Sequence, residues 1–152
     1  MLLKIVKIIK KQSIILDASV VVKWFSTDNE QDYDKASFIL QLIKNGDMEL
    51  IIPDLLLYEL SNALLKSKNF DIQSLNSAVK TILDLEVEIF NAQLPLLEKT
   101  NEMAATYSLT IYDALYAALA VIKQCKLITA NPKCFNKIRE EYVVNLADVE
   151  VE

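Results

Sequence analysis

The sequence predicts an α/β domain in which a parallel sheet of about five strands is flanked by helices on both faces. Short apolar runs alternate with longer stretches whose apolar residues recur at helical spacing, and this alternation is typical of strand–helix–strand units. The apolar runs are nearly continuous, as expected for strands buried on both faces. No glycine–serine linker or internal repeat interrupts the pattern in the 152 residues. We therefore predict a basic extension over residues 1–12 and one three-layer domain over residues 13–152.

Five segments have the character of strands. The first brings three aliphatic residues directly to Asp17, and Pro53 is expected to stop the second. The strands are expected at about 13–17, Leu50–Ile52, Val87–Phe90, Lys126–Thr129 and Val143–Leu146.

The helices between these strands are indicated by apolar stripes and by residues that begin or end helices. Asp54, Asp71 and Asp113 precede helical stretches and are expected as N-caps, while Pro95 suits a first helical turn. Gly46 is expected just beyond a helix C-terminus. The predicted helices are 18–25, 30–45, 55–67, 71–85, 95–107, 114–124 and 133–140, with turns at 26–29 and 131–132. The apolar face of the helix at 55–67 is expected to comprise Leu56, Leu57, Leu60, Ala63 and Leu64.

Composition excludes several kinds of site. The single glycine excludes glycine-rich phosphate loops, and the absence of histidine excludes histidine-based triads and metal sites. The net charge of −5 means that binding to nucleic acid would need a local basic patch or bridging cations. Cys125 and Cys134 cannot form a zinc site alone; we expect unpaired thiols, with a disulfide as the alternative. Carboxylates, hydroxyls and lysines remain for chemistry.

Residues 1–12 look at first like a targeting segment. Lysines interrupt each apolar run, so no membrane span is expected, and a signal peptide would place its charges ahead of the apolar stretch. Both a partly ordered tail and a basic amphipathic extension that touches RNA or a membrane surface stay open. The cysteine usage is compatible with a cytoplasmic protein.

Three acidic residues are candidates for a common site. Asp17 ends the first strand, Glu59 lies one turn into the helix after the second, and Asp113 begins the helix before the fourth. Because ligands bind at the carboxyl ends of parallel strands, we expect these carboxylates to converge there, with Thr129 and Asn131 at the same level. Taken singly, Glu59 suits a solvated helix face and Asp113 an ordinary N-cap. Clustered carboxylates repel one another, so convergence favours a divalent cation.

Four stretches, in this order along the chain, resemble the motifs of PIN-domain nucleases, and in particular the VapC-like toxins of bacterial and archaeal toxin–antitoxin pairs. They are Leu16–Val20, Pro53–Leu64, Tyr112–Ala120 and Leu127–Asn131. The resemblance extends from about residue 14 to residue 147. It implies a five-stranded parallel sheet flanked by helices, a ribonuclease site that uses Mg²⁺ or Mn²⁺, an RNA substrate, a homodimer and a cognate antitoxin protein.

The resemblance also implies roles for individual residues. Its three core acidic positions match Asp17, Glu59 and Asp113 as catalytic and metal-binding residues. The candidates for hydrogen bonds to the ligands or to substrate phosphate are Ser19, Asn62, Thr129 and Asn131.

Asn131 is a departure from the family pattern, because many members carry a fourth acidic residue there. An amide can orient water but adds no charge, so we expect one firmly held ion that keeps some of its water. Lys23 and Lys66 either reach substrate phosphates or are ordinary surface lysines.

Other classes of protein also place acids at the rim of a parallel sheet. A phosphoacceptor receiver domain would pair acids at the first strand, whereas Ala18 follows Asp17 here. A phosphatase of the haloacid dehalogenase type would have Asp-x-Asp, whereas position 19 is serine. A PIN-like fold that no longer cleaves, and that binds RNA or protein, is the alternative that Asn131 and the acidic net charge leave open.

Overall fold

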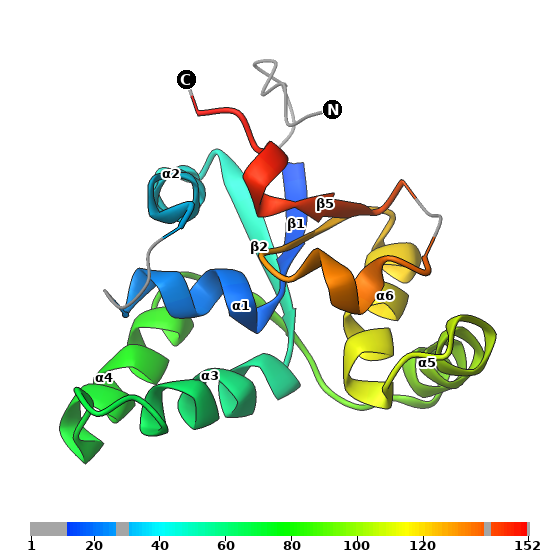
Figure 1. Cartoon of the computed structure of the whole chain (residues 1–152), viewed down its shortest axis with the longest axis horizontal. Helices are drawn as coiled ribbons and strands as arrows, with labels where there is room; N and C mark the ends of the chain where they lie inside the picture. The colour runs from blue at the N-terminus through cyan, green and yellow to red at the C-terminus, as the bar shows by residue number, and fades with distance from the viewer. Residues whose placement is uncertain (1–11, 27–30, 139–140, 152) are drawn as a thin grey trace.

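Five parallel strands form the centre of the molecule in the computed structural model, which describes residues 12–26, 31–138 and 141–151 (Figure 1). The strands are β1 (Gln12–Leu16), β2 (Met48–Pro53), β3 (Glu88–Phe90), β4 (Lys126–Thr129) and β5 (Val143–Asn145). The α-helices are α1 (Ala18–Val21), α2 (Tyr33–Lys44), α3 (Leu55–Leu65), α4 (Ile72–Leu83), α5 (Leu94–Tyr107) and α6 (Ile111–Lys123). Short 3₁₀ helices are η1 (Val22–Trp24), η2 (Pro132–Phe135) and η3 (Leu146–Asp148). The predicted parallel α/β fold is confirmed.

The strand order is β3-β2-β1-β4-β5, which places β1 in the middle of the sheet. Ile14 pairs with Leu50 of β2 on one side and with Lys126 of β4 on the other. The chain builds the sheet outward from β1 to β3 and then crosses to the opposite side of β1 for β4. The direction of winding therefore changes between β1 and β4, and ligands bind in open α/β sheets at the carboxyl ends of the strands beside such a switch point.

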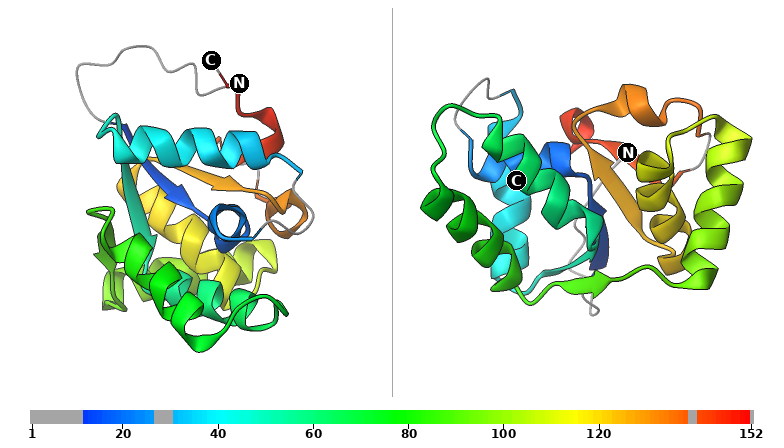
Figure 2. Two further views of the ribbon diagram at one scale, coloured as in Figure 1. Left: turned by 90° about the vertical axis from the view of Figure 1, so that its left-hand side faces the viewer. Right: turned by 90° about the horizontal axis from the view of Figure 1, so that it is seen from below.

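Helices cover both faces of the sheet (Figures 1 and 2). The helix α6 packs against β1, β2 and β4, and α5 packs on α6, while α2 covers the opposite face. The helices α3 and α4 lie beyond the carboxyl end of β2, towards which the strand points in Figure 1. Small side chains allow α6 to approach the sheet closely, because four of its alanines are at most 1% exposed: Ala114, Ala117, Ala118 and Ala120.

Three of the predicted helix signals are confirmed. Asp71 caps α4 by accepting a hydrogen bond from the Ser74 amide at 2.8 Å, and Pro95 lies in the first turn of α5. Gly46 follows α2 with a φ of 76°, where a side chain would be strained. Its amide donates to the Ile43 carbonyl at 3.0 Å, which satisfies one of the last carbonyls of the helix.

The predicted capping roles of Asp54 and Asp113 are wrong. Asp54 precedes α3 with helical backbone angles, and its side chain makes no capping hydrogen bond. The helix α6 begins at Ile111, three residues earlier than predicted, because Thr110 is its N-cap and accepts from the Asp113 amide at 3.1 Å. A threonine is as capable a cap as an aspartate, and its presence leaves the Asp113 carboxylate for another role.

Several boundaries also differ from the prediction. Pro53 ends β2 as a paired residue opposite Phe90 rather than stopping the strand before it, since proline is tolerated at a strand end. Ala63 is exposed on α3, where every fourth residue (Leu56, Leu60, Leu64) forms the buried stripe.

The predicted helix at 133–140 is only the 3₁₀ helix η2, whose i→i+3 bonds include one from the Cys134 amide to the Asn131 carbonyl at 3.2 Å. The predictions for residues 1–11, 27–29 and 139–140 lie outside the described residues. Among the described helices, no single one is long and apolar enough to cross a membrane; α5 and α6 would reach that length only together, with a bend of 116° between them.

The contact of α6 with the sheet depends on small side chains, and this can be tested. We expect Ala118→Leu to lower the free energy of unfolding by about 1–3 kcal/mol, because the position is fully buried and a larger side chain would push α6 off the strands. Urea unfolding measures the effect. The matched control is Ala105→Leu on the exposed side of α5, which should change stability by less than about 0.5 kcal/mol. Equal effects at the two positions would contradict the close packing.

Candidate active site

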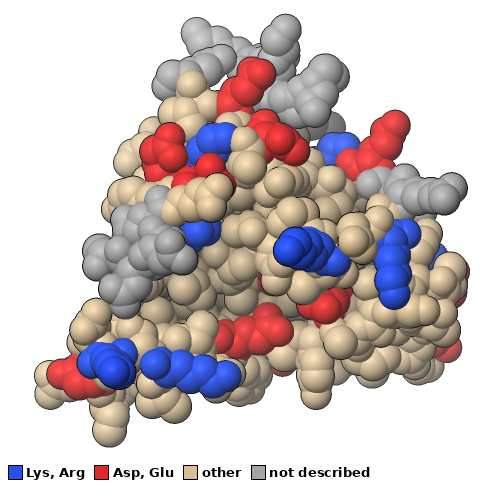
Figure 3. Space-filling model, in the orientation of Figure 1, with Lys and Arg blue, Asp and Glu red and all other residues tan. Residues whose placement is uncertain are grey.

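Acidic side chains lie in a hollow between the α3–α4 lobe and the segment around η2, with lysine side chains on both sides (Figure 3). This hollow is at the carboxyl end of the sheet, where the paired strands β1 and β4 end side by side. Asp17 follows β1 directly, and its amide donates to the Ile128 carbonyl of β4 at 3.0 Å. The first predicted site residue is therefore held at the switch point of the sheet.

The Asp17 carboxylate is held by two hydroxyls. Its Oδ2 atom accepts from Ser19 Oγ at 2.8 Å and from Thr129 Oγ1 at 2.9 Å. Each hydroxyl in turn accepts from a backbone amide, Ser19 from Ala130 and Thr129 from Asn131, both at 3.0 Å. A hydroxyl has one proton, and the accepted amide hydrogen orients that proton towards Asp17.

This network fixes which Asp17 oxygen is available. Oδ2 is occupied by two donors, whereas within the described residues no donor bonds to Oδ1. Thr129 is fully buried, so its hydroxyl cannot exchange Asp17 for water. Ser19 and Thr129, both predicted as hydrogen-bonding residues of the site, thus orient Asp17 so that Oδ1 can serve a ligand.

Glu59 projects from α3 and is half-buried. Its Oε2 atom accepts a hydrogen bond from the Tyr116 hydroxyl of α6 at 2.6 Å. Burial raises the pKa of Glu59, the charges of Asp17 and Asp113 raise it further, and the bond from Tyr116 opposes them. Burial and the Glu59 carboxylate raise the pKa of Tyr116 above its usual range, so the phenol stays a neutral donor.

Asp113 lies in the first turn of α6, half-buried, with Thr110 rather than itself as the cap. Burial raises the pKa of Asp113, a hydrogen bond with the Thr110 side chain opposes this, and the charge of Asp17 adds to the rise. The charge of Asp17 thus adds to the raised pKa values of both Glu59 and Asp113, so the three carboxylates lie within electrostatic range of one another. Their role as a common ligand set stays a prediction.

The site has the chemistry of a hard-cation site, although the described Asp, Glu and Cys side chains nowhere stand close enough in threes to enclose a metal ion. All its ligand atoms are oxygens, and burial, with the negative charge of Asp17 added, raises the pKa values of Glu59 and Asp113. A cation such as Mg²⁺ keeps several waters and binds proteins through one or two carboxylates. The residues therefore fit a divalent cation whose coordination is completed by water.

The remaining predicted residues differ in their relation to the site. Asn131 is exposed beyond β4, and its Nδ2 donates to Cys134 Sγ at 3.2 Å. Asn62 is exposed on α3, one turn after Glu59, and its side chain makes no hydrogen bond within the described residues. Cys134 and Cys125 are unpaired thiols, and burial raises the pKa of both.

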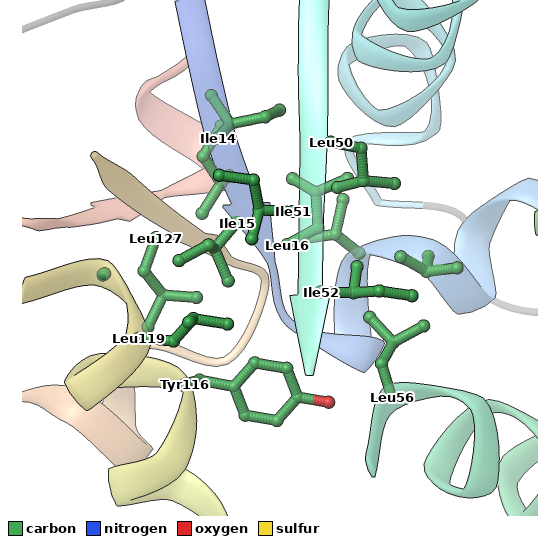
Figure 4. Packing of buried hydrophobic residues seen from close by; sticks show 14 of the residues in the cluster. Ile14, Ile15, Leu16, Leu50, Ile51, Ile52, Leu56, Tyr116, Leu119 and Leu127 are labelled. Carbon is green, nitrogen blue, oxygen red and sulfur yellow. The ribbon is translucent and has the colours of Figure 1, made fainter. Parts of the chain in front are cut away.

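Tyr116 is the residue of the site that sequence reasoning missed. Its ring lies below the carboxyl end of β2, and its hydroxyl points away from α6 towards the side of α3 (Figure 4). One signal could have revealed it: Tyr116 follows Asp113 by three positions, on the buried alanine-rich face of the helix. A buried tyrosine hydroxyl requires a partner, and i and i+3 positions share one helix face.

Comparison with known proteins places the chain in a family. The family model for the PIN domain matches residues 14–141. No curated protein sequence matches this chain.

Several solved structures share the fold at low sequence identity. The structure of VapBC2 from Rickettsia felis bound to a DNA fragment from their promoter has a TM-score of 0.66 and 21% identity, covering 88% of this chain and 98% of that one. DNA-bound VapBC from Salmonella typhimurium has a TM-score of 0.68 and 16% identity, covering 89% of this chain and 98% of that one. VapC20 from Mycobacterium tuberculosis, a toxin that cleaves the sarcin–ricin loop, has a TM-score of 0.60 and 14% identity. The match covers 77% of this chain and 87% of that one. Because the family model spans most of the sequence, the chain belongs to the PIN-domain family.

Proposed function

We propose that the protein is a ribonuclease that requires Mg²⁺ or Mn²⁺ and hydrolyses phosphodiester bonds of RNA. The observation that carries this proposal is the arrangement around Asp17. Two hydroxyls occupy its Oδ2 atom and leave Oδ1 available, while Glu59 and Asp113 are close enough for its charge to raise their pKa values. A site that accumulates unbalanced negative charge at the switch point of the sheet favours a divalent cation.

The carboxylates have distinct roles in this proposal. Asp17 and Asp113 hold the cation, directly or through water, and Glu59 is a further ligand or orients the attacking water. When bound, the cation activates water and neutralises developing charge on the phosphate. A carboxylate with a raised pKa is the better proton acceptor near neutral pH, which suits Glu59 to receiving the proton of that water.

Lysines supply the attraction for RNA that the acidic chain otherwise lacks, and Figure 3 shows lysine side chains on both sides of the hollow. Lys66 and Lys68 lie at the turn between α3 and α4, and Lys133 and Lys137 lie in and just after η2. These four form no ion pair within the described part of the chain, so their charges remain available to substrate phosphates. Lys23 is already engaged, donating to the Gln31 carbonyl at 2.9 Å.

We further propose that the protein is the cytoplasmic toxin of a toxin–antitoxin pair, a homodimer that binds a cognate antitoxin. The support is the shared fold with solved VapBC complexes. Large apolar side chains are exposed on two parts of the surface that suit these contacts. They are Tyr58, Leu65 and Ile72 on α3 and α4, and Leu94, Ile111 and Tyr112 in the first turns of α5 and α6.

The central prediction concerns activity. Asp17→Asn and Asp113→Asn should each lower the rate of Mn²⁺-dependent RNA cleavage by at least about 100-fold, since even residues behind metal ligands typically contribute 10–100-fold. Gel-based cleavage of a labelled RNA with purified protein measures this.

The matched control is Asp47→Asn, an exposed aspartate beyond the C-terminus of α2, which should cleave at the parental rate. If the parent binds RNA but cleaves none in Mn²⁺, and Asp17→Asn binds Mn²⁺ as well as the parent, the catalytic proposal is wrong. The protein would then be a non-catalytic PIN-fold module, and the replacement of a fourth acidic residue by Asn131 would contribute to the loss of catalysis.

A second prediction concerns stability without metal. Burial, opposed in part by Thr110 and reinforced by Asp17, holds the pKa of Asp113 above 3.8 in the folded protein. The protonated form is therefore favoured by folding, and this contribution is complete below the unfolded pKa and lost as pH rises through the folded one. At pH 7 the ionised group costs stability, so Asp113→Asn should raise the unfolding midpoint.

The rise should be below about 4 °C, because the group is half exposed and solvent screens its charge. Adding Mn²⁺ should reverse the order: the parent gains roughly 2.7 kcal/mol at a hundred times its Kd, and Asp113→Asn gains far less. Differential scanning calorimetry at pH 7 with and without Mn²⁺ gives both values. A parent that is more stable than Asp113→Asn in the absence of metal would contradict the electrostatic account.

A further inference from the structure

We propose that Tyr116 is a positioning residue that holds the Glu59 carboxylate by its Oε2 atom, so that Glu59 presents Oε1 to the cation and the attacking water. The role of Glu59 in this inference rests on the proposed function. The bond itself does not, because it is a direct contact between α6 and α3.

The first step is the placement of the ring. Tyr116 is 1% exposed, and its ring is part of the core together with Leu119 and Leu127. Figure 4 shows the ring below the tip of β2, with the hydroxyl pointing away from α6 in the direction of Leu56 on α3. Only the hydroxyl can reach a polar group, and the group it reaches is Glu59 Oε2 at 2.6 Å.

The second step is that burial enforces this contact. A phenol hydroxyl inside the core loses its hydrogen bonds to water and is destabilised if it has no protein partner. Within the described residues, the Tyr116 hydroxyl donates its hydrogen bond to Glu59. Rotation of Glu59 away from Tyr116 would leave that hydroxyl unsatisfied, so the carboxylate is held in one orientation.

The third step is a shared pattern between two carboxylates. Asp17 has Oδ2 occupied by Ser19 and Thr129, and Glu59 has Oε2 occupied by Tyr116. Among the residues that the structure describes, each carboxylate therefore has one oxygen with protein donors and one oxygen without them. Such a carboxylate suits a single-oxygen contact and disfavours chelation by both oxygens. Fixing the ligand before the cation arrives is the general function of groups behind a metal site.

An ordinary core tyrosine would behave differently on substitution. If Tyr116 only filled space, Tyr116→Phe would keep the ring in place and leave the properties of Glu59 unchanged. If Tyr116 positions Glu59, loss of the hydroxyl must change what Glu59 does and must have no effect once the Glu59 carboxylate is gone.

The experiment is a double-mutant cycle on Mn²⁺ binding. Calorimetric titration of the full chain with Mn²⁺, in the absence of RNA, measures the affinity of each variant. Tyr116→Phe should weaken Mn²⁺ binding by about 10-fold relative to the parent. In the Glu59→Ala background, the same substitution should change the Mn²⁺ affinity by less than about twofold, since the acceptor is absent. Tyr33→Phe, which removes a hydroxyl from a 43% exposed tyrosine at the start of α2, should bind Mn²⁺ as the parent does.

Kinetics add a second readout. Tyr116→Phe should lower kcat for RNA cleavage by about 10-fold and leave KM within about twofold, because the RNA-binding lysines are untouched. Equal Mn²⁺ affinity in Tyr116→Phe and the parent, including no binding by either, would overturn this inference, as would an undiminished effect in the Glu59→Ala background. A parent that binds Mn²⁺ but cleaves no RNA would overturn the proposed function instead, and the binding cycle would still decide the role of Tyr116.

Discussion

The repulsion among three carboxylates at the switch point of the sheet is the constraint on which the rest of the site depends. Two unit charges about 4 Å apart cost roughly 4 kcal/mol at an effective dielectric near 20, so such a cluster persists only if the fold holds it. Here the fold does so by burial and hydrogen bonding. Burial raises the pKa values of Glu59 and Asp113, the hydrogen bonds with Tyr116 and Thr110 oppose this rise, and the charge of Asp17 adds to it at both residues.

The sheet supplies the positions and the helices supply the support. Strands β1 and β4 end side by side, which brings Asp17 to Thr129, and a fully buried threonine makes the contact permanent. Alanines allow α6 to lie close to the strands, which brings Asp113 to the rim and lets Tyr116 reach α3. The same helix thus contributes one carboxylate and positions another. The chain has no histidine, and its chemistry is built from oxygen ligands and the groups that orient them.

Much of the fold could be predicted because apolar runs and helical stripes follow directly from burial. The same reasoning predicts that Asp17, Glu59 and Asp113 lie at one rim of the sheet, but it does not predict the order of the strands, which depends on long-range pairing. Capping was less predictable, since Thr110 and Asp113 are both good caps and only tertiary placement decides between them. Asn62 follows Glu59 by three positions, yet it is exposed while Glu59 is half-buried. Spacing along a helix predicts a shared face, but it does not predict which residues of that face are covered by other elements. Tyr116 was missed because its partner lies 57 residues away, on a helix that the sequence alone does not place beside it.

The most direct test of the account is anomalous diffraction from crystals of the protein equilibrated with Mn²⁺ at neutral pH. The account predicts one strong manganese peak in the hollow at the end of β1, next to Asp17 Oδ1 and bordered by Glu59 and Asp113, with Glu59 Oε2 still bonded to Tyr116. A saturating concentration of Mn²⁺ that produces no peak beside Asp17, or a peak only at acidic residues elsewhere on the surface, would contradict it.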